Sequence, residues 1–279
     1  MLAAPHGPKR RCRRLALAGG IGMLLAVPFG PPMAAAAEAW QATYDAYVAG
    51  ANAARLTTLF HLDTAGYRMD VQARTLGLLD VFVGARQSTQ VDGTWHEAQL
   101  RPRQFRAEGV WKGERRVTRI DYHAGDPRLQ ELAPADPQRE AVPAAARLHA
   151  MDRLSPLALL ARQVARTGQC DTRANTYDGR RLEETTSRTA GWDDLPPSSI
   201  SSFAGRALRC DIEIRMTAGF LADEDRAHAG RLRHAQVWLA APAAGAPMLP
   251  VRFQLDAGWL GHATVYLSAF SPVASFPLR

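Results

Sequence analysis

The stretch LRCDIEIRM, at residues 208–216, decides the fold class of this chain. Apolar Leu, Cys, Ile, Ile and Met alternate in it with polar Arg, Asp, Glu and Arg. Successive side chains of a strand point to opposite faces of a sheet, so this alternation predicts a strand with one face in a core and the other in water. One-sided strands are typical of antiparallel sheets, because parallel strands are usually buried on both faces.

The same two-residue period recurs along the chain. It is clear in YRMDVQA at 67–73 and in LPVRFQLDA at 249–257. Weaker strand signals occur at 54–63, 115–122, 180–187, 232–240 and 262–270. Turn signals between the runs stand at Ala65-Gly66, Asp92-Gly93, Gly113 and Asp178-Gly179. We therefore expect an all-β protein of about ten strands, an antiparallel meander that forms a barrel or a strongly curved sheet.

Three stretches break the strand pattern. Residues 124–147 are rich in proline and mixed charge, which predicts an exposed loop. Residues 155–167, SPLALLARQVART, predict a helix that Ser155 caps, with Pro156 in its first turn and an apolar face that covers an opening of the sheet. Residues 76–85, LGLLDVFVGA, fit a second short helix or a buried strand, and the sequence leaves that choice open.

Residues 1–37 have the features of a cleaved secretory signal peptide. Five basic and no acidic residues are followed by an apolar run at 15–27 that is too short to span a bilayer, and then by small residues typical of a cleavage site. Cleavage removes five of the 34 basic residues and none of the 27 acidic ones, so the net charge falls from +7 to +2. We expect an exported protein, in the periplasm or outside the cell. Residues 38–279 then form a single β-rich domain with no membrane span and no basic excess that favours nucleic acid.

The cysteines support the same compartment. Cys12 precedes the apolar run, whereas Cys170 and Cys210 remain after cleavage as an even pair in an oxidising space. A disulfide between them is favoured over a catalytic thiol or a metal ligand, because neither has the neighbouring residues that those roles need. We expect the bridge to be largely buried, since Cys210 shares the apolar face of its strand.

Signals of catalysis and of metal or cofactor binding are weak. The chain has no Gly-x-Ser-x-Gly motif and no paired-histidine metal motif, so we assign no catalytic residue, no metal and no cofactor. Strand carboxylates at Asp211, Glu213 and Asp256 could act as a glycosidase pair, or could simply form a polar outer face. Two apolar loop tips beside glycines contain candidate ligand-facing or rim residues, which are Phe220, Leu221, Trp259 and Leu260.

Several segments together resemble the exported bacterial proteins of the domain-of-unknown-function 3108 family. They are WQATYDAYVAGANAARLTTLFHL, DRLSPLALLARQV, YDGRRLEE, GRALRCDIEIRMTAGF and PVRFQLDAGWLGHATVYLSAF, and they span about residues 40–270. The start of the predicted helix at 152–157 and the YDGRR turn at 177–181 are the most specific pieces. The AGANAAR segment departs from the family pattern, which often has a second glycine in the first hairpin. The resemblance implies an all-β, barrel-like exported protein and no known reaction.

Three functions remain open on these grounds. The first is a non-catalytic periplasmic protein that binds or shelters a hydrophobic, lipid-like ligand or aids envelope assembly, with an envelope protein as a further candidate partner. The second is an envelope hydrolase that uses the strand carboxylates. The third is a structural module that pairs through a sheet edge.

Overall fold

The computed structural model describes residues 39–97, 99–256 and 261–273, all within one compact unit, Ala36–Arg279. The predicted signal peptide and the rim residues Trp259 and Leu260 lie outside the described residues. The strands are β1 (Ala39–Val48), β2 (Ala51–Leu62), β3 (Gly66–Thr75), β4 (Arg86–His96), β5 (Gln99–Trp111), β6 (Glu114–His123), β7 (Asp126–Ala133), β8 (Thr172–Tyr177), β9 (Leu182–Leu195), β10 (Gly205–Ala218), β11 (Arg233–Ala240), β12 (Leu249–Asp256) and β13 (His262–Val273). The helices are α1 (Gly77–Val83), α2 (Ala144–Arg147), α3 (Ser155–Thr167) and α4 (Arg226–Ala229).

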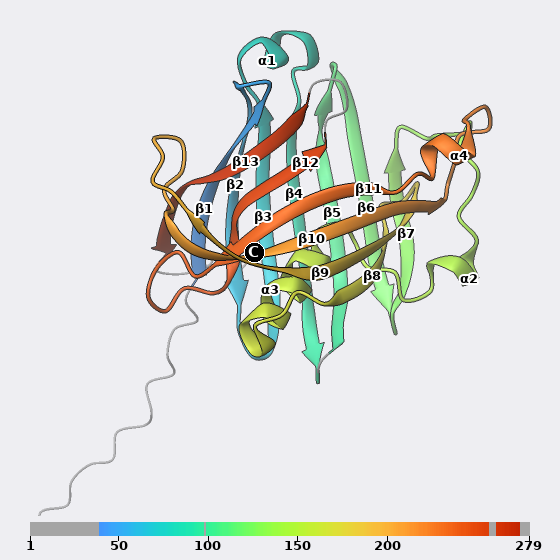
Figure 1. Cartoon of the computed structure of the whole chain (residues 1–279). Coiled ribbons are helices and arrows are strands. Elements are labelled where there is room, and N and C mark those ends of the chain that lie inside the picture. The colour runs from blue at the N-terminus through green and yellow to red at the C-terminus, as the bar shows by residue number, and fades with distance from the viewer. Residues whose placement is uncertain (1–38, 98, 257–260, 274–279) are drawn as a thin grey trace, which may run out of the picture. The chain divides into compact units, whose positions relative to one another are not determined.

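All these strands belong to one antiparallel sheet. Its order is β7-β6-β5-β4-β3-β2-β1-β13-β12-β11-β10-β9-β8 (Figure 1). Two meanders, β1–β7 and β8–β13, are joined where β1 pairs with β13, and Trp40 stacks on Phe270 across this seam with ring centroids 4.9 Å apart. The sheet curves into a nearly closed barrel, as the sequence predicted, and among the strands of the described residues only β7 and β8 are edges.

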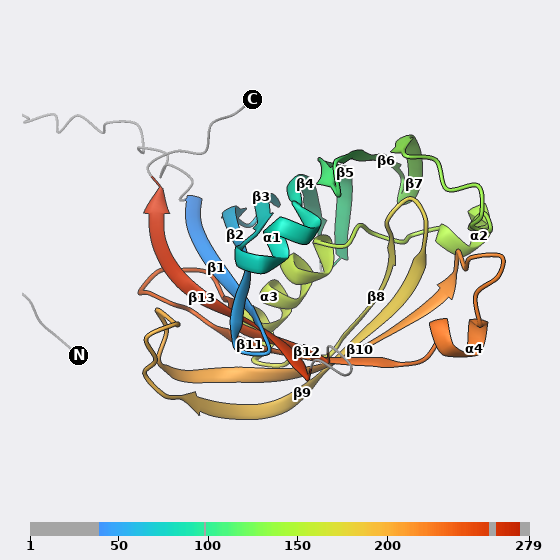
Figure 2. The ribbon, with the colours of Figure 1, turned by 90° about the horizontal axis from the view of Figure 1, so that it is seen from above.

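Residues 134–154 cross the gap between the two edges. The backbone N–H of His149 donates to Gly125 after β6, and the backbone of Met151 exchanges hydrogen bonds with Asn175 and Tyr177 on β8. The β8 edge is therefore partly occupied by the chain itself. The helix α3 follows this segment in the chain. Figure 2 shows it inside the curve of the sheet, between the β2–β5 side and the β8–β10 side.

Three local predictions were wrong. Residues 126–133 of the expected loop form the edge strand β7. Proline has no backbone N–H to donate, and an edge strand tolerates Pro127 because it pairs with a neighbouring strand on one side only. Asp92-Gly93 is not a turn but lies inside β4, at a register shift against β5. Ser155 does not cap α3. The carboxylate of Asp152 does so instead, accepting the backbone N–H groups of Leu154 at 2.8 Å and Ser155 at 2.9 Å.

Two other features agree with the pattern or resolve its ambiguity. Residues 77–83 form the helix α1 and not a strand. The Asp178-Gly179 turn is present: the Asp178 carboxylate accepts the N–H groups of Arg180 and Arg181, and Gly179 has a positive φ of 89° that favours glycine. This turn positions the first residues of β9, among which Glu183 lines the cavity beside α3.

A candidate binding cavity with a charged end

A half-open cavity of about 550 Å³ lies between α3 and the sheet. One wall is formed by strands β1–β3 and is mainly apolar. Its residues are Tyr44, Leu56, Thr58, Phe60, Leu62, Met69 and Val71. The helix contributes a second apolar surface, with Pro156, Leu157, Ala158, Leu160 and Ala161. This volume is within the range of small-molecule sites, and such apolar lining is typical of them.

The opposite wall, from β8 to β13, becomes more polar along β9. Alternate β9 residues line the cavity because side chains two apart share a face. They run from Ser187 and Thr185 to Glu183, and Arg181, just before the strand begins, continues the row. Ser187 and Thr185 lie opposite Ile212 and Ile214 of β10. The charged Glu183 and Arg181 lie near the Asp178 turn. Arg252 of β12 also lines the cavity, and its guanidinium lies over the rings of Trp238 and Tyr266. The cavity is therefore mainly apolar, and its carboxylate and the other three lining arginines lie at one end.

The charged end is a network built around Glu183. Arg233 donates to the Glu183 carboxylate at 2.5 Å, and Arg153 lies 3.8 Å from the same group while it pairs with Asp178 at 2.7 Å. The Glu183 side chain is only 13 % exposed, whereas Arg153 and Arg233 are about half exposed. Arg181 also lines the cavity, and its guanidinium takes part in none of the ion pairs or hydrogen bonds of the described chain.

Tyr44 adds a polar atom to the apolar wall. Its ring is buried, and its hydroxyl oxygen has no hydrogen-bond partner within the described parts of the protein. Burial raises the pKa of this phenol, so the hydroxyl stays protonated and can donate. Because a buried polar group without a partner is costly, this hydroxyl is a candidate contact for a bound molecule or for water.

The first turn of α3 is fixed by a buried polar chain. Tyr67 on β3 hydrogen-bonds to the Ser155 hydroxyl, which in turn donates to the fully buried Asp152 carboxylate. Burial raises the pKa of Asp152, and the hydrogen bonds that it accepts offset part of this effect. These contacts hold the cavity-facing side of α3 against the sheet. Since Asp152 has no exposed surface, the chain supports the helix and offers no reactive group to a ligand.

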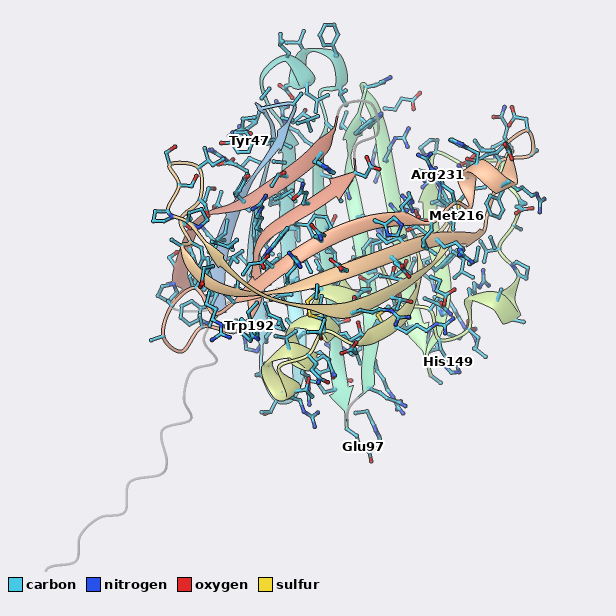
Figure 3. The ribbon with its side chains drawn as sticks, viewed as in Figure 1. Tyr47, Glu97, His149, Trp192, Met216 and Arg231 are labelled. Carbon is cyan, nitrogen blue, oxygen red and sulfur yellow. A yellow bond between two sulfur atoms is a disulfide. The ribbon has the colours of Figure 1, made fainter. Side chains whose placement is uncertain are left out.

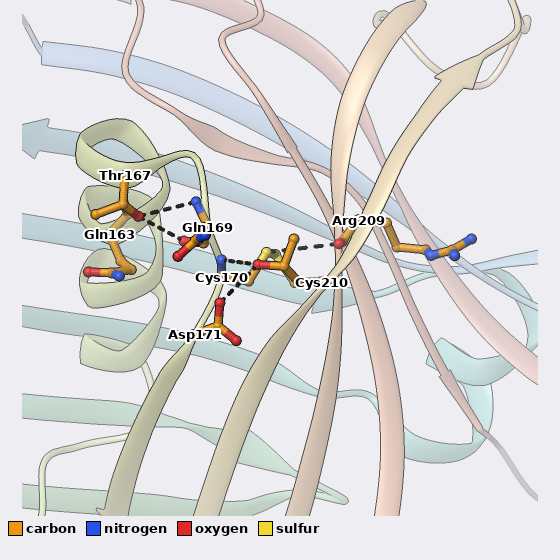
Figure 4. The surroundings of a disulfide bond; sticks show 8 residues. Gln163, Thr167, Gln169, Cys170, Asp171, Arg209 and Cys210 are labelled. Atoms are coloured by element: carbon orange, nitrogen blue, oxygen red, sulfur yellow. Dashed lines mark hydrogen bonds between the residues drawn. A yellow bond between two sulfur atoms is a disulfide. The ribbon is translucent and has the colours of Figure 1, made fainter.

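The other end of α3 is tied to the sheet by a covalent bond. Cys170 and Cys210 form the predicted disulfide (Figure 4). Both cysteines are fully buried beside Leu208 and Ile212. The Cys170 backbone N–H donates to the Thr189 hydroxyl at 2.8 Å, which connects the same segment to β9. The disulfide therefore anchors the chain between α3 and β8 to the middle of β10.

The predicted rim residues that are described lie elsewhere. Phe220 is 8 % exposed, and its backbone exchanges hydrogen bonds with Glu140 at 2.9 Å and 3.1 Å. Leu221 forms an isolated β-bridge with Arg139. Neither residue lines the cavity, because the loop that follows Gly219 packs against the segment that crosses between the sheet edges. Trp259 and Leu260 are outside the described residues.

The strand carboxylates do not meet in the cavity. Asp211 lies on an exposed face and accepts a hydrogen bond from Gln236 at 2.9 Å, and Glu183 is the one carboxylate in the described cavity lining. A glycosidase needs two carboxyl groups on either side of its substrate, so this cavity lacks the pair that the hydrolase hypothesis needs. In the described ranges no cluster of three or more His, Cys, Asp or Glu could hold a metal ion.

Sequence reasoning missed the charged end, although part of its signal was visible. Arg181, Glu183 and Thr185 alternate in RRLEETTS, but an alternating polar face is ordinarily assigned to water. Here that face lines the cavity. The contributions of Arg153 and Arg233 could not be found from the chain order, because they come from segments far apart in the sequence.

Comparisons with known proteins place the chain in a family. No curated protein matches it. A solved structure described as a beta-barrel-like protein of domain of unknown function DUF1849 from Brucella abortus matches with a TM-score of 0.50 and 12 % sequence identity, covering 86 % of this chain and 100 % of that one. This likeness concerns the fold alone. The family model described as "Protein of unknown function (DUF3108)" matches residues 43–268, and the chain therefore belongs to the DUF3108 family.

Proposed function

We propose that this protein is a non-catalytic binding protein that shelters an amphiphilic, lipid-like molecule with an anionic head group. The observation that carries the proposal is the 550 Å³ cavity, apolar along β1–β3 and α3 and charged at the end formed by β9. A molecule with a matching apolar part would remove these side chains from water, which is the main source of affinity for such ligands.

The charged end favours an anionic head group over a cationic one. Three arginines, Arg153, Arg181 and Arg233, stand there against the Glu183 carboxylate. Arg153 and Arg233 are already engaged with carboxylates, but Arg181 has no such partner among the residues described. A guanidinium group binds carboxylate or phosphate oxygens with two parallel hydrogen bonds, so Arg181 is the group that we assign to the head.

The location belongs to the proposal as well. We infer export to the periplasm or the cell exterior from the sequence of residues 1–37, and the buried disulfide is the kind of bond that persists in such a compartment. No helix in the described part of the chain is long and apolar enough to cross a membrane. An envelope protein that delivers or receives the ligand would be the natural partner.

The experiment uses protein purified without its first 37 residues. Native mass spectrometry is expected to detect a co-purified amphiphile, and a fluorescent fatty-acid probe should bind and be displaced by unlabelled lipid. Leu157→Trp places a bulky ring in the cavity and should abolish probe binding, whereas Ala165→Trp, on the exposed side of α3, should leave it unchanged.

The head group is tested separately. Arg181→Gln should weaken an anionic probe by about tenfold and leave its uncharged methyl ester nearly unaffected. Arg188→Gln, at an exposed position on β9, is the matched control. Equal loss for both probes would contradict the anionic assignment. Absence of any ligand and of probe binding in the wild-type protein would contradict the binding function itself.

A further inference from the structure

Six exposed apolar side chains gather at one end of the molecule, where α1 meets the β5–β6 hairpin. They are Leu78, Leu79, Val81, Phe82, Val110 and Trp111, with exposed fractions of 79 %, 40 %, 79 %, 76 %, 42 % and 44 %. We call this set the apolar tip. Figure 1 shows α1 projecting beyond the strand ends beside this hairpin. Clustered exposed side chains of this size usually mark a surface that contacts something other than water.

The apolar tip is held in place by polar contacts beneath it. The Thr75 hydroxyl donates to the Asp80 carboxylate at 2.7 Å and accepts the Ala85 N–H at 2.9 Å. The Lys112 N–H donates to the Val83 carbonyl at 2.9 Å, which joins the hairpin to the helix. No residue of α1 is buried, so the helix turns its one carboxylate toward the sheet and its apolar side chains toward solvent.

A row of arginines crosses the sheet just below the tip. The strand register places Arg55 opposite Arg74, Arg74 opposite Arg86, Arg86 opposite Val110, and Val110 opposite Arg115. Arg55 is paired with Asp45, and Arg115 lies 3.8 Å from Glu131. Arg74 and Arg86 have no ion pair with any described residue. Like charges directly opposite each other weaken a sheet, and an external anion would relieve this.

We propose that the apolar tip docks on an anionic membrane surface. Its aliphatic and aromatic side chains would enter the head-group region, while Arg74, Arg86 and the exposed Lys112 contact lipid phosphates. Aromatic side chains such as Trp111 and Phe82, beside cations that have no ion pair within the described ranges, are the pattern of interfacial membrane binding. This inference does not depend on the cavity, since none of these residues lines it.

Vesicle flotation tests the docking. Protein without residues 1–37 should float with vesicles of phosphatidylglycerol and phosphatidylcholine in equal parts, and much less with phosphatidylcholine alone. Leu78→Ser/Phe82→Ser and Arg74→Gln/Arg86→Gln should each weaken binding by about tenfold. Trp192→Ser is the matched control: Trp192 is 48 % exposed on β9, well away from α1 (Figure 3), and its loss should change nothing.

A second readout does not depend on the folding of these variants. An environment-sensitive dye on Phe82→Cys should shift to the blue when anionic vesicles are added, and the same dye on Trp192→Cys should not. Equal flotation of wild type and both double variants, or an unshifted dye at position 82, would overturn the proposal. So would a wild-type dimer that the Leu78→Ser/Phe82→Ser change converts to a monomer, because the tip would then be covered by a second copy.

Discussion

The Tyr67 hydroxyl on β3 is hydrogen-bonded to the Ser155 hydroxyl in the first turn of α3, 88 residues further along the chain. The Ser155 hydroxyl in turn donates to the buried Asp152 carboxylate, which also caps the helix. This chain of contacts joins the helix that lines one side of the cavity to the strand that lines the other. We expect the stability of the protein to depend on it in a graded way.

Asp152→Ala should lower the free energy of unfolding by about 3 kcal/mol, because it leaves buried N–H and O–H donors without acceptors. Tyr67→Phe should cost only about 1 kcal/mol, since Ser155 keeps its bond to Asp152. Urea unfolding measures both. Equal losses for the two variants would show that the Asp152 carboxylate is not the centre of the network.

The Asp45–Arg55 pair predicts a pH dependence. The hydrogen bond from Arg55, 2.7 Å long, lowers the pKa of Asp45, so the folded protein binds this proton less tightly than the unfolded chain. The stabilisation is therefore present above the usual aspartate pKa of about 4 and is lost as the pH falls through the lower, folded-state value.

Arg55→Gln is the variant that tests this pair. It should destabilise the protein by about 1 kcal/mol at neutral pH, a small effect because Arg55 is partly exposed to water. Urea titrations should show the difference from wild type shrinking on acidification. A difference that stays constant from neutral pH down to about pH 2 would contradict the assignment.

The Cys170–Cys210 disulfide closes a loop with a sequence separation of 40. Cys210→Ser should lower the melting temperature, and the chain-entropy contribution of such a loop is about 4 kcal/mol. Calorimetry of the variant and of reduced wild-type protein should give similar losses. A non-reducing mass measurement that finds two free thiols in the wild type would refute the bond.

Gly93 allows the Tyr67 ring to approach β4. A methyl group there would lie 2.5 Å from the Arg101 carbonyl oxygen and 2.5 Å from the Tyr67 ring. Gly93→Ala should therefore cost about 2 kcal/mol through overpacking, measured by thermal unfolding. Thr94→Ala, at the exposed neighbouring position, is the control, and an equal small effect for both would show that β4 has room to move.

Part of the architecture could be predicted because its signal is local. The alternation at 208–216 identifies β10, and the Asp178 turn uses residues that bond within three positions of each other. Strands β4 and β5 escaped prediction, since polar residues occupy much of the face that would have marked them. Gly93 was predicted as a turn residue because it follows Asp92. Its role in the structure is to leave space for the Tyr67 ring and the Arg101 carbonyl, and the sequence does not place either of them beside it.

The sequence by itself determined the all-β antiparallel class and favoured the pairing of Cys170 with Cys210, since two-residue periodicity and a cysteine count need no knowledge of distant neighbours. Only the tertiary structure decided that the polar face of β9 lines a cavity, that the Arg181 guanidinium there has no partner among the described residues, and that Arg74 and Arg86 lie opposite each other below an apolar tip. Those relationships depend on the curvature and register of the sheet. Both arise from pairings between residues far apart in the chain, and a local sequence pattern carries no information about such pairings.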